Sequence, residues 1–313
     1  MFLRRKLTVM ATVALLSTSL LAGCSSSGEN SNGGSNGGGT ATAAEVLANK
    51  NARAAISMII DKQAYCDVIL NNGSIPTSTF TPKGLAFDNG KDYTDLTEGM
   101  GYEYNEEQAK ELWEKAKEEV GFDTVEMELL TFDHDTGKRT GEYIQSELSD
   151  LEGLTVKVSN LPFKQKLERE TNGEFDLAFS GWGADYPDPL TYLSTMQTGN
   201  QFSNQVGYNS EEYNKLIEEA MKLPITEGYA KYAEAEKLML EDGYLAPIYQ
   251  KASAYLEKDY VSGIVNNSWG ADYTYTYADV DKDDKVLNLA TSSDIPTLDL
   301  SKATDQQSFQ TAN

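Results

Sequence analysis

The chain is 313 residues long and carries 49 acidic against 26 basic side chains, a formal net charge of −23 at neutral pH. This strongly acidic charge disfavours binding to nucleic acid. It also disfavours direct electrostatic docking on anionic lipid head groups. The roughly 270 residues that follow the leader and linker described below suffice for one large domain or two smaller ones.

The first 24 residues have the pattern of a lipoprotein export signal. Basic residues at 4–6 precede an apolar stretch over 7–21, and an L-A-G-C motif ends at Cys24. The apolar stretch is too short to favour a membrane-spanning helix, whereas small residues before a cysteine favour cleavage and diacylation of that cysteine. We therefore expect residues 1–24 to be a signal peptide and Cys24 to anchor the protein on the extracytoplasmic face of a cell membrane.

Residues 25–43 are predicted to form a flexible tether. They consist largely of Ser, Gly and Asn, a composition that cannot bury a core. The second cysteine of the chain, Cys66, has no expected mature partner for a disulfide, because we expect Cys24 to be lipidated. We expect Cys66 to be a buried thiol and the folded body to depend on packing.

The first folded elements are predicted to be helical. Residues 43–70 show apolar side chains at helical spacing, with a break near Asp61. Asn105 then has the character of a helix N-cap, with Gln108 as its capping-box partner, and Gly121 is the expected end of that helix.

An alternation of strand and helix patterns follows. Strands are predicted at 125–131, 154–159 and 175–180, and helices lie between them at 138–151 and 163–171. A β-α-β-α-β series predicts an α/β fold with a parallel sheet.

The loop after the third predicted strand carries the strongest functional signal. It reads G-W-G-A-D-Y-P-D-P over residues 181–189 and combines aromatic rings, flexible glycines, two acids and rigid prolines. Open α/β sheets bind their ligands at the carboxyl ends of their strands, where this loop begins. An acid there suits a cationic group, although a purely structural turn is the alternative.

Two acidic helices, at 210–223 and 226–242, precede a tyrosine-rich and β-leaning tail at 244–277. The pentapeptide W-G-A-D-Y recurs in this tail at 269–273. We do not interpret the two copies as a structural repeat, because their flanks differ and two short matches are too few for a solenoid.

Four features together resemble the oligopeptide-binding lipoproteins of ABC importers, the peptide/nickel type of extracellular solute-binding proteins. These are the lipobox, the R-A-A-I-x-x-x-I-D-K helix from Arg53 to Lys62, the G-W-G-A-D-Y-P-D-P loop, and the segments A-E-K-L-M at 235–239 and A-P-I-Y at 246–249. The resemblance covers nearly all of residues 44–313. It implies a periplasmic-binding-protein-like lobe and capture of oligopeptides for an ABC transporter permease.

The resemblance also implies the site residues. Asp185 occupies the position whose aspartate pairs with the terminal ammonium of the peptide, and Trp182 and Gly183 line the groove, with Ala184 and Tyr186 completing its shape. Main-chain pairing with the peptide, like an added strand, gives affinity with little regard for side chains. The resemblance implies a monomer that is not an enzyme, without cofactor or metal.

Two departures from the family pattern affect specificity and domain organisation. Phe179 stands where some members place a basic residue for the peptide carboxylate, so selection of one peptide length by that contact is not expected. Residues 285–299 resemble the mature beginning of the family although they follow its usual end, which reads as a circular permutation. We expect a peptide-binding lobe at 44–245 and a β-rich segment of the other lobe at 246–313, without the small extra domain and part of the first lobe.

Other interpretations of the acidic and polar residues are weaker. Asp188 is expected to cap the helix that begins at Leu190, and His134 to cap a loop rather than bind metal. The D-x-D-x-D stretch at 279–283 lacks the glycine and glutamate of a calcium loop. A hydrolase using Asp185 and Asp188 has no supporting motif. A lipid-anchored peptide sensor or adhesin would share the binding chemistry and stays open.

Overall fold

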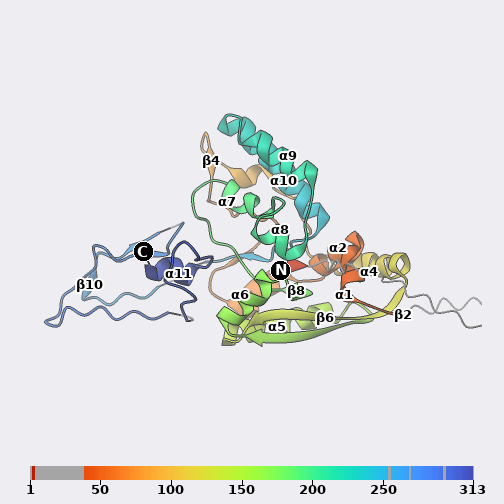
Figure 1. Ribbon diagram of the computed structural model, residues 1–313, viewed down its shortest axis with the longest axis horizontal. Coiled ribbons are helices and arrows are strands. Elements are labelled where there is room, and N and C mark those ends of the chain that lie inside the picture. The colour runs from red at the N-terminus through yellow and green to blue at the C-terminus, as the bar shows by residue number, and fades with distance from the viewer. Residues whose placement is uncertain (1, 4–38, 253–254, 268, 292–293, 313) are drawn as a thin grey trace, which may run out of the picture.

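The structure is a computed structural model, and it describes residues 2–3, 39–252, 255–267, 269–291 and 294–312. The predicted signal peptide beyond residues 2–3 and most of the predicted tether, including Cys24, lie outside these residues. Helices and a sheet form one body, and the C-terminal segment extends from it to the left of Figure 1. Among the described residues, no helix has the length and apolarity needed to cross a membrane.

The core of the body is a parallel sheet centred on strand β6, Phe122–Phe132. Strand β7, Leu154–Leu161, pairs with one edge of β6, and the short strands β2, Gly39–Ala41, and β8, Leu177–Ala178, pair with the other. The two residues of β1, Phe2–Leu3, pair antiparallel with β8. The predicted β-α-β-α-β series and its parallel pairing are confirmed, and β2 lies within the range assigned to the tether.

Helices cover both faces of this sheet, as expected for a buried parallel sheet. Helix α5, Asp135–Leu148, connects β6 to β7, and helix α6, Phe163–Thr171, connects β7 back across β6 to β8. The connection from β6 to β7 and the connection from β7 to β8 run in opposite directions across the sheet. Because both are expected to be right-handed, they place α5 and α6 on opposite faces. The change of direction also leaves a crevice at the carboxyl ends of β6 and β8.

The pleat of the strands divides the apolar side chains between two cores. Leu129 and Leu177 point into a first core shared with the N-terminal helices and α5, whereas Leu130 and Ala178 point into a second core shared with the later helices. Cys66 is buried in the first core, as predicted.

Three helices enclose the first core: α1 (Ala43–Ala48), α2 (Lys50–Met58) and α4 (Glu106–Val120). The short helix α3 (Lys62–Ala64) also contributes and continues into a π-helical turn, η1 (Tyr65–Leu70). The predicted break at Asp61 is confirmed, because Asp61 caps α3. The prediction missed a second break at Asn49, whose side chain accepts hydrogen bonds from the amides of Asn51 and Ala52 and so begins a new helix.

The bounds predicted for α4 and α6 are confirmed. Asn105 caps α4 by accepting from the amide of Gln108, and Gly121 ends it with φ of +81°. The reciprocal half of the capping box does not form, since the amide of Asn105 donates to the carbonyl of Met58. Strand β8 is shorter than predicted because it pairs with β6 only at Leu129 and Leu130.

The second core is enclosed by α7, Leu190–Leu193, with its 3₁₀ continuation η3, Ser194–Met196, and by α8, Gln201–Val206, α9, Glu211–Ala220, and α10, Ile225–Asp242. A hairpin of β4, Phe87–Asp88, and β5, Lys91–Asp92, with the 3₁₀ turn η2, Tyr93–Leu96, packs beside α10. The top of Figure 1 shows this group.

Within the described part of the C-terminal segment, the predicted β-leaning tail forms strands of two residues each, and a helix follows. Strand β3, Ile75–Pro76, pairs with β9, Tyr249–Gln250; β10, Val261–Ser262, pairs with β13, Asp279–Val280; β11, Val265–Asn266, pairs with β12, Tyr273–Thr274. Helix α11 spans Gln306–Ala312.

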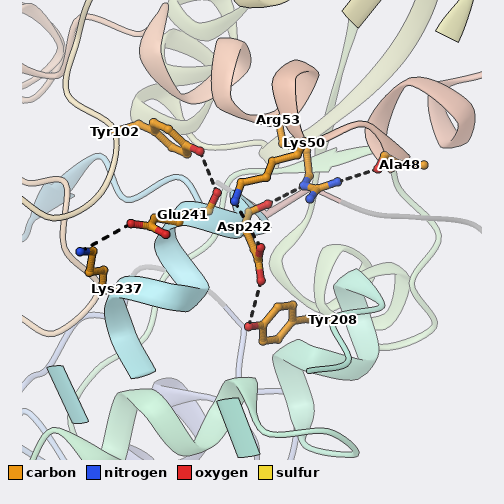
Figure 2. Close-up of polar contacts among 8 residues, drawn as sticks. All are labelled: Ala48, Lys50, Arg53, Tyr102, Tyr208, Lys237, Glu241 and Asp242. Carbon is orange, nitrogen blue, oxygen red and sulfur yellow. Dashed lines mark hydrogen bonds and ion pairs between the residues drawn. The ribbon is translucent and has the colours of Figure 1, made fainter. Parts of the chain in front are cut away.

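A buried arginine joins the two cores. Arg53 of α2 donates from Nε to the carbonyl of Asp242, 2.7 Å away at the end of α10, and from one terminal nitrogen to the carbonyl of Ala48 at 3.0 Å (Figure 2). The same terminal nitrogen donates to the carbonyl of Leu47 at 2.9 Å. These carbonyls lie at the ends of α10 and α1, where helices leave acceptors unsatisfied and where the helix dipole favours a cation. The guanidinium also stacks over the ring of Tyr244 at 4.1 Å.

A buried glutamate fixes the segment that follows β3. Glu236 of α10 is fully buried and accepts from the amides of Phe80 and Thr81 at 2.8 and 2.9 Å, from the Thr81 hydroxyl at 2.7 Å and from the Tyr93 hydroxyl at 3.1 Å. Burial raises the pKa of Glu236, and its hydrogen bonds oppose that shift. Four donors thus converge on one carboxylate.

We predict that Arg53→Met destabilises the protein by about 3 kcal/mol, because it removes the donors of the buried Leu47 carbonyl and of the partly buried bonds to Ala48 and Asp242. The measurement is the free energy of unfolding from urea titration. The control is Lys50→Met, which removes an exposed ion pair with Asp242 at 3.6 Å and should cost about 0.5 kcal/mol or less. Equal losses in the two variants would contradict the role given to Arg53.

We predict that Glu236→Ala costs about 3 kcal/mol or more, since it strands two amides and two hydroxyls in a buried site. Glu236→Gln retains the size and one acceptor oxygen, and it should lose about half as much. Urea unfolding of both variants tests this. A loss in Glu236→Ala no larger than in Glu236→Gln would show that the hydrogen bonds contribute little.

Candidate functional site

A cavity of about 640 Å³ opens at the crevice beyond the carboxyl ends of β6 and β8. Phe132, the last residue of β6, and the residues that follow β8 both line it. The site therefore lies where a change of direction in an open α/β sheet places it. Its volume is within the range of small-molecule and short-peptide sites.

Four segments that are distant in the sequence form the walls. The first wall is the loop after β8, Phe179 to Ala184, together with Tyr192. The second wall follows β3 and consists of Thr77, Thr79, Phe80 and Pro82 to Leu85. The third wall, Leu245 to Lys251, contains β9, and the fourth comes from the C-terminal segment with Trp269, Gly270, Asp272 and Gln306. Aromatic residues contribute to every one of these walls.

Hydrogen bonds to helix α7 hold the loop of the first wall in shape. The indole of Trp182 donates to the carbonyl of Thr191 at 2.9 Å, and the amide of Asp185 donates to the Thr191 hydroxyl at 3.0 Å. The Tyr192 hydroxyl donates to the carbonyl of Trp182 at 3.2 Å. Because Trp182 and Asp185 are both tied to one helix, the main chain between them is held in a fixed conformation.

Asp188 has the capping role predicted for it. Its carboxylate accepts from the amide of Leu190 at 2.9 Å at the start of α7. This contact uses Asp188 to begin a helix, so the structure gives no support to a hydrolase that pairs it with Asp185.

The structure brings three of the five predicted ligand-binding residues to the cavity, namely Trp182, Gly183 and Ala184. Asp185 and Tyr186, the next two residues of the loop, are exposed and are not among the residues that line it. The carboxylate of Asp185 is nevertheless close to the wall: the pKa of Tyr192 is raised to about 12, first by burial and then by the charge of Asp185. Asp185 thus lies at the rim.

Partial burial raises the pKa of Asp185, and no neighbouring cation among the described residues lowers it. The residue as a whole is exposed, so we attribute this pKa shift to partial shielding of the carboxylate by the surrounding loop. A carboxylate that is partly desolvated and unpaired is suited to receive a cation from solution.

A buried ion pair supports the entry to the loop from below. Lys166 of α6 is fully buried and contacts Glu170 at 2.5 Å, and both groups bond to the hydroxyl of Ser180, at 3.2 and 3.3 Å. The ammonium of Lys166 also lies 4.3 Å from the centre of the Phe132 ring. Since Ser180 and Phe132 line the cavity, the pair fixes part of its floor without introducing a net charge.

Sequence reasoning missed the second and third walls and the buried pair. Glu236, which fixes Phe80 of the second wall, interrupts the apolar face of α10 and so left a signal in the sequence. Lys83 and Lys251, two exposed cations on the walls, and the Lys166–Glu170 pair resemble ordinary surface residues in the sequence. Only the tertiary structure identifies them.

The two metal sites considered from the sequence do not form in the described part of the chain. No group of His, Cys, Asp and Glu side chains there could hold a metal ion. His134 caps helix α5, where a loop cap was expected, by accepting from the amide of Gly137 at 3.0 Å. Asp279 of the D-x-D-x-D stretch instead pairs with Lys285 at 3.1 Å.

The chain is similar to known peptide-binding proteins. It is 31% identical over 238 residues to the dipeptide-binding protein of Lactococcus lactis subsp. cremoris, a match that covers 74% of this chain and 43% of the relative. The peptide-bound OppA of Listeria monocytogenes is 37% identical with a TM-score of 0.71, covering 76% of this chain and 46% of that one. The chain thus spans less than half the length of these relatives.

A third match is a shorter protein, and the alignment covers nearly all of it. The crystal structure of a peptide-binding protein of a peptide ABC transporter is 36% identical with a TM-score of 0.62, and 93% of it is covered by 66% of this chain. These likenesses confirm the predicted α/β fold of the periplasmic-binding-protein type. Residues 28–204 match the middle part of the family 5 bacterial extracellular solute-binding proteins. The chain therefore belongs to this family of extracytoplasmic substrate-binding proteins.

Proposed function

We propose that the chain is the peptide-binding part of an ABC importer and that the loop from Trp182 to Tyr186 grips the amino end of an oligopeptide. The observation that carries this proposal is the unpaired, partly desolvated carboxylate of Asp185 at the rim of the 640 Å³ cavity lined by Trp182, Gly183 and Ala184. An ammonium at the rim would form a charge-assisted hydrogen bond with Asp185, and the peptide would continue into the cavity.

The composition of the walls favours recognition of the peptide main chain. The loop places Gly183 and Ala184 along the cavity, and the third wall adds the chain from Leu245 to Lys251, which includes strand β9. Extended peptides bind to protein main chain as an added strand, while aromatic walls accept varied side chains. The relatives named above bind dipeptides or peptides, which agrees with this chemistry.

The setting of the protein is part of the same proposal. Cys24 would carry a diacylglyceryl anchor on the extracytoplasmic face of the membrane, and the Ser-, Gly- and Asn-rich stretch after it would tether a monomeric body beside the permease. The acidic surface would keep this body away from anionic head groups.

We expect Asp185→Asn to weaken binding of a mixed pool of tri- to hexapeptides by about 10- to 100-fold, because the amide cannot neutralise the ammonium. The same pool acetylated at its amino ends should bind the parent as weakly as the free pool binds the variant. Calorimetric titration of the full chain measures both. Asp150→Asn, which removes one exposed acidic charge at the end of α5, is the control for net charge.

The affinity of the parent should also fall as the pH is lowered into the acid range. Because burial raises the pKa of Asp185, its protonation begins at a higher pH than for an ordinary aspartate, and the protonated acid loses its attraction for ammonium. Asp185→Asn should not show this fall. If Asp272→Asn abolishes binding while Asp185→Asn does not, the anchor is the other acid of the cavity and our assignment of Asp185 is wrong.

A further inference from the structure

The second W-G-A-D-Y copy, rejected above as a structural repeat, contacts the first copy directly. The amide of Gly270 donates to the carbonyl of Ala184 over 2.8 Å. Trp269, Gly270 and Asp272 line the same cavity as Trp182, Gly183 and Ala184. The tail therefore bonds to the main chain of the very loop that we propose for peptide recognition.

The segment that makes this contact is braced from behind. We call Trp269–Thr274 together with α11 the C-terminal cap. The side chain of Gln306 donates to the carbonyl of Gly270 at 2.8 Å, and that of Gln310 accepts from the amide of Tyr273 at 2.8 Å and donates to its carbonyl at 2.7 Å. Three side-chain bonds from one helix thus hold the main chain of the cap in place.

The shape of the cap at Gly270 is specific to glycine. This residue has φ of +70°, in the left-handed region that side chains disfavour, and an added Cβ would lie 4.0 Å from the carbonyl of Asp185. In this conformation the Gly270 amide donates to Ala184, and both residues line the cavity.

We propose that the C-terminal cap is an intramolecular competitor for the peptide. Resting on the proposed function, the inference is that the Gly270 amide occupies the Ala184 carbonyl, which a bound peptide needs for main-chain pairing, so that binding requires the cap to move. When the cap engages this carbonyl in most molecules, only the remaining open molecules can bind peptide. The apparent affinity for peptide is then reduced in proportion to the open fraction. Variants that loosen the cap should therefore bind peptide more tightly.

The test uses Gln310→Leu in the full chain. Gln310 does not line the cavity, and the substitution removes both of its bonds to Tyr273 while leaving the loop intact. We expect the pool of tri- to hexapeptides to bind about three- to tenfold more tightly to this variant. Thr311→Ala is the matched control: the hydroxyl of this exposed neighbour on α11 donates within its own helix, to the carbonyl of Gln307, so its loss should leave the affinity unchanged.

Hydrogen exchange of the Gly270 amide provides an independent readout. In the parent, addition of the peptide pool should accelerate its exchange, because the peptide displaces the amide from Ala184. In Gln310→Leu without peptide the exchange should already be faster than in the parent.

The outcomes separate the two proposals. Slower exchange at Gly270 on peptide addition, or weaker binding by Gln310→Leu, would mean that the cap closes over the peptide as part of its site, and would overturn competition. Equal affinity of the parent and Gln310→Leu, together with unchanged exchange in the parent, would also overturn it. Absence of binding to both proteins would instead refute the proposed function, and competition with it, even if Gly270 exchanges faster in the variant.

Discussion

The fold depends on how Arg53 is accommodated. A buried guanidinium must keep its donors satisfied, and here it donates to carbonyls at the ends of α1 and α10. Since α1 belongs to the first core and α10 to the second, one side chain fixes the distance between them. Figure 2 shows how the last turn of α10 gathers around this group, with Tyr208 and Lys50 both reaching Asp242.

The position of α10 in turn determines the walls of the cavity. Glu236 of α10 holds Phe80 and Thr81, and the chain that follows α10 runs directly into the third wall. On the other side of the crevice, Lys166 and Glu170 fix Ser180 below the loop. The site is thus made from buried polar groups whose partners are satisfied, so its main chain is held before any ligand arrives, and less ordering is left for binding to supply.

The sequence predicted best those elements whose limits are set by neighbouring residues. Asn105 and Gly121 determine the ends of α4, and His134 and Asp188 begin helices, because a cap acts over three or four residues. The sequence predicted element limits less well where contacts with distant segments determine them. Strand β8 pairs over only two residues, and Asn49 splits a stretch that has continuous helical periodicity.

By itself the sequence determined the parallel β-α-β-α-β core, the family, and the loop at the carboxyl end of a strand, because periodicity, caps and motifs are local properties. Only the tertiary structure decided that Ala184 meets Gly270, that Asp185 lies at the rim beside a lining of Trp182, Gly183 and Ala184, and that Lys166 and Glu236 are buried. The physical reason is that burial and hydrogen bonds between distant segments depend on which faces meet, and a charged residue reads the same in a sequence whether it is solvated or enclosed.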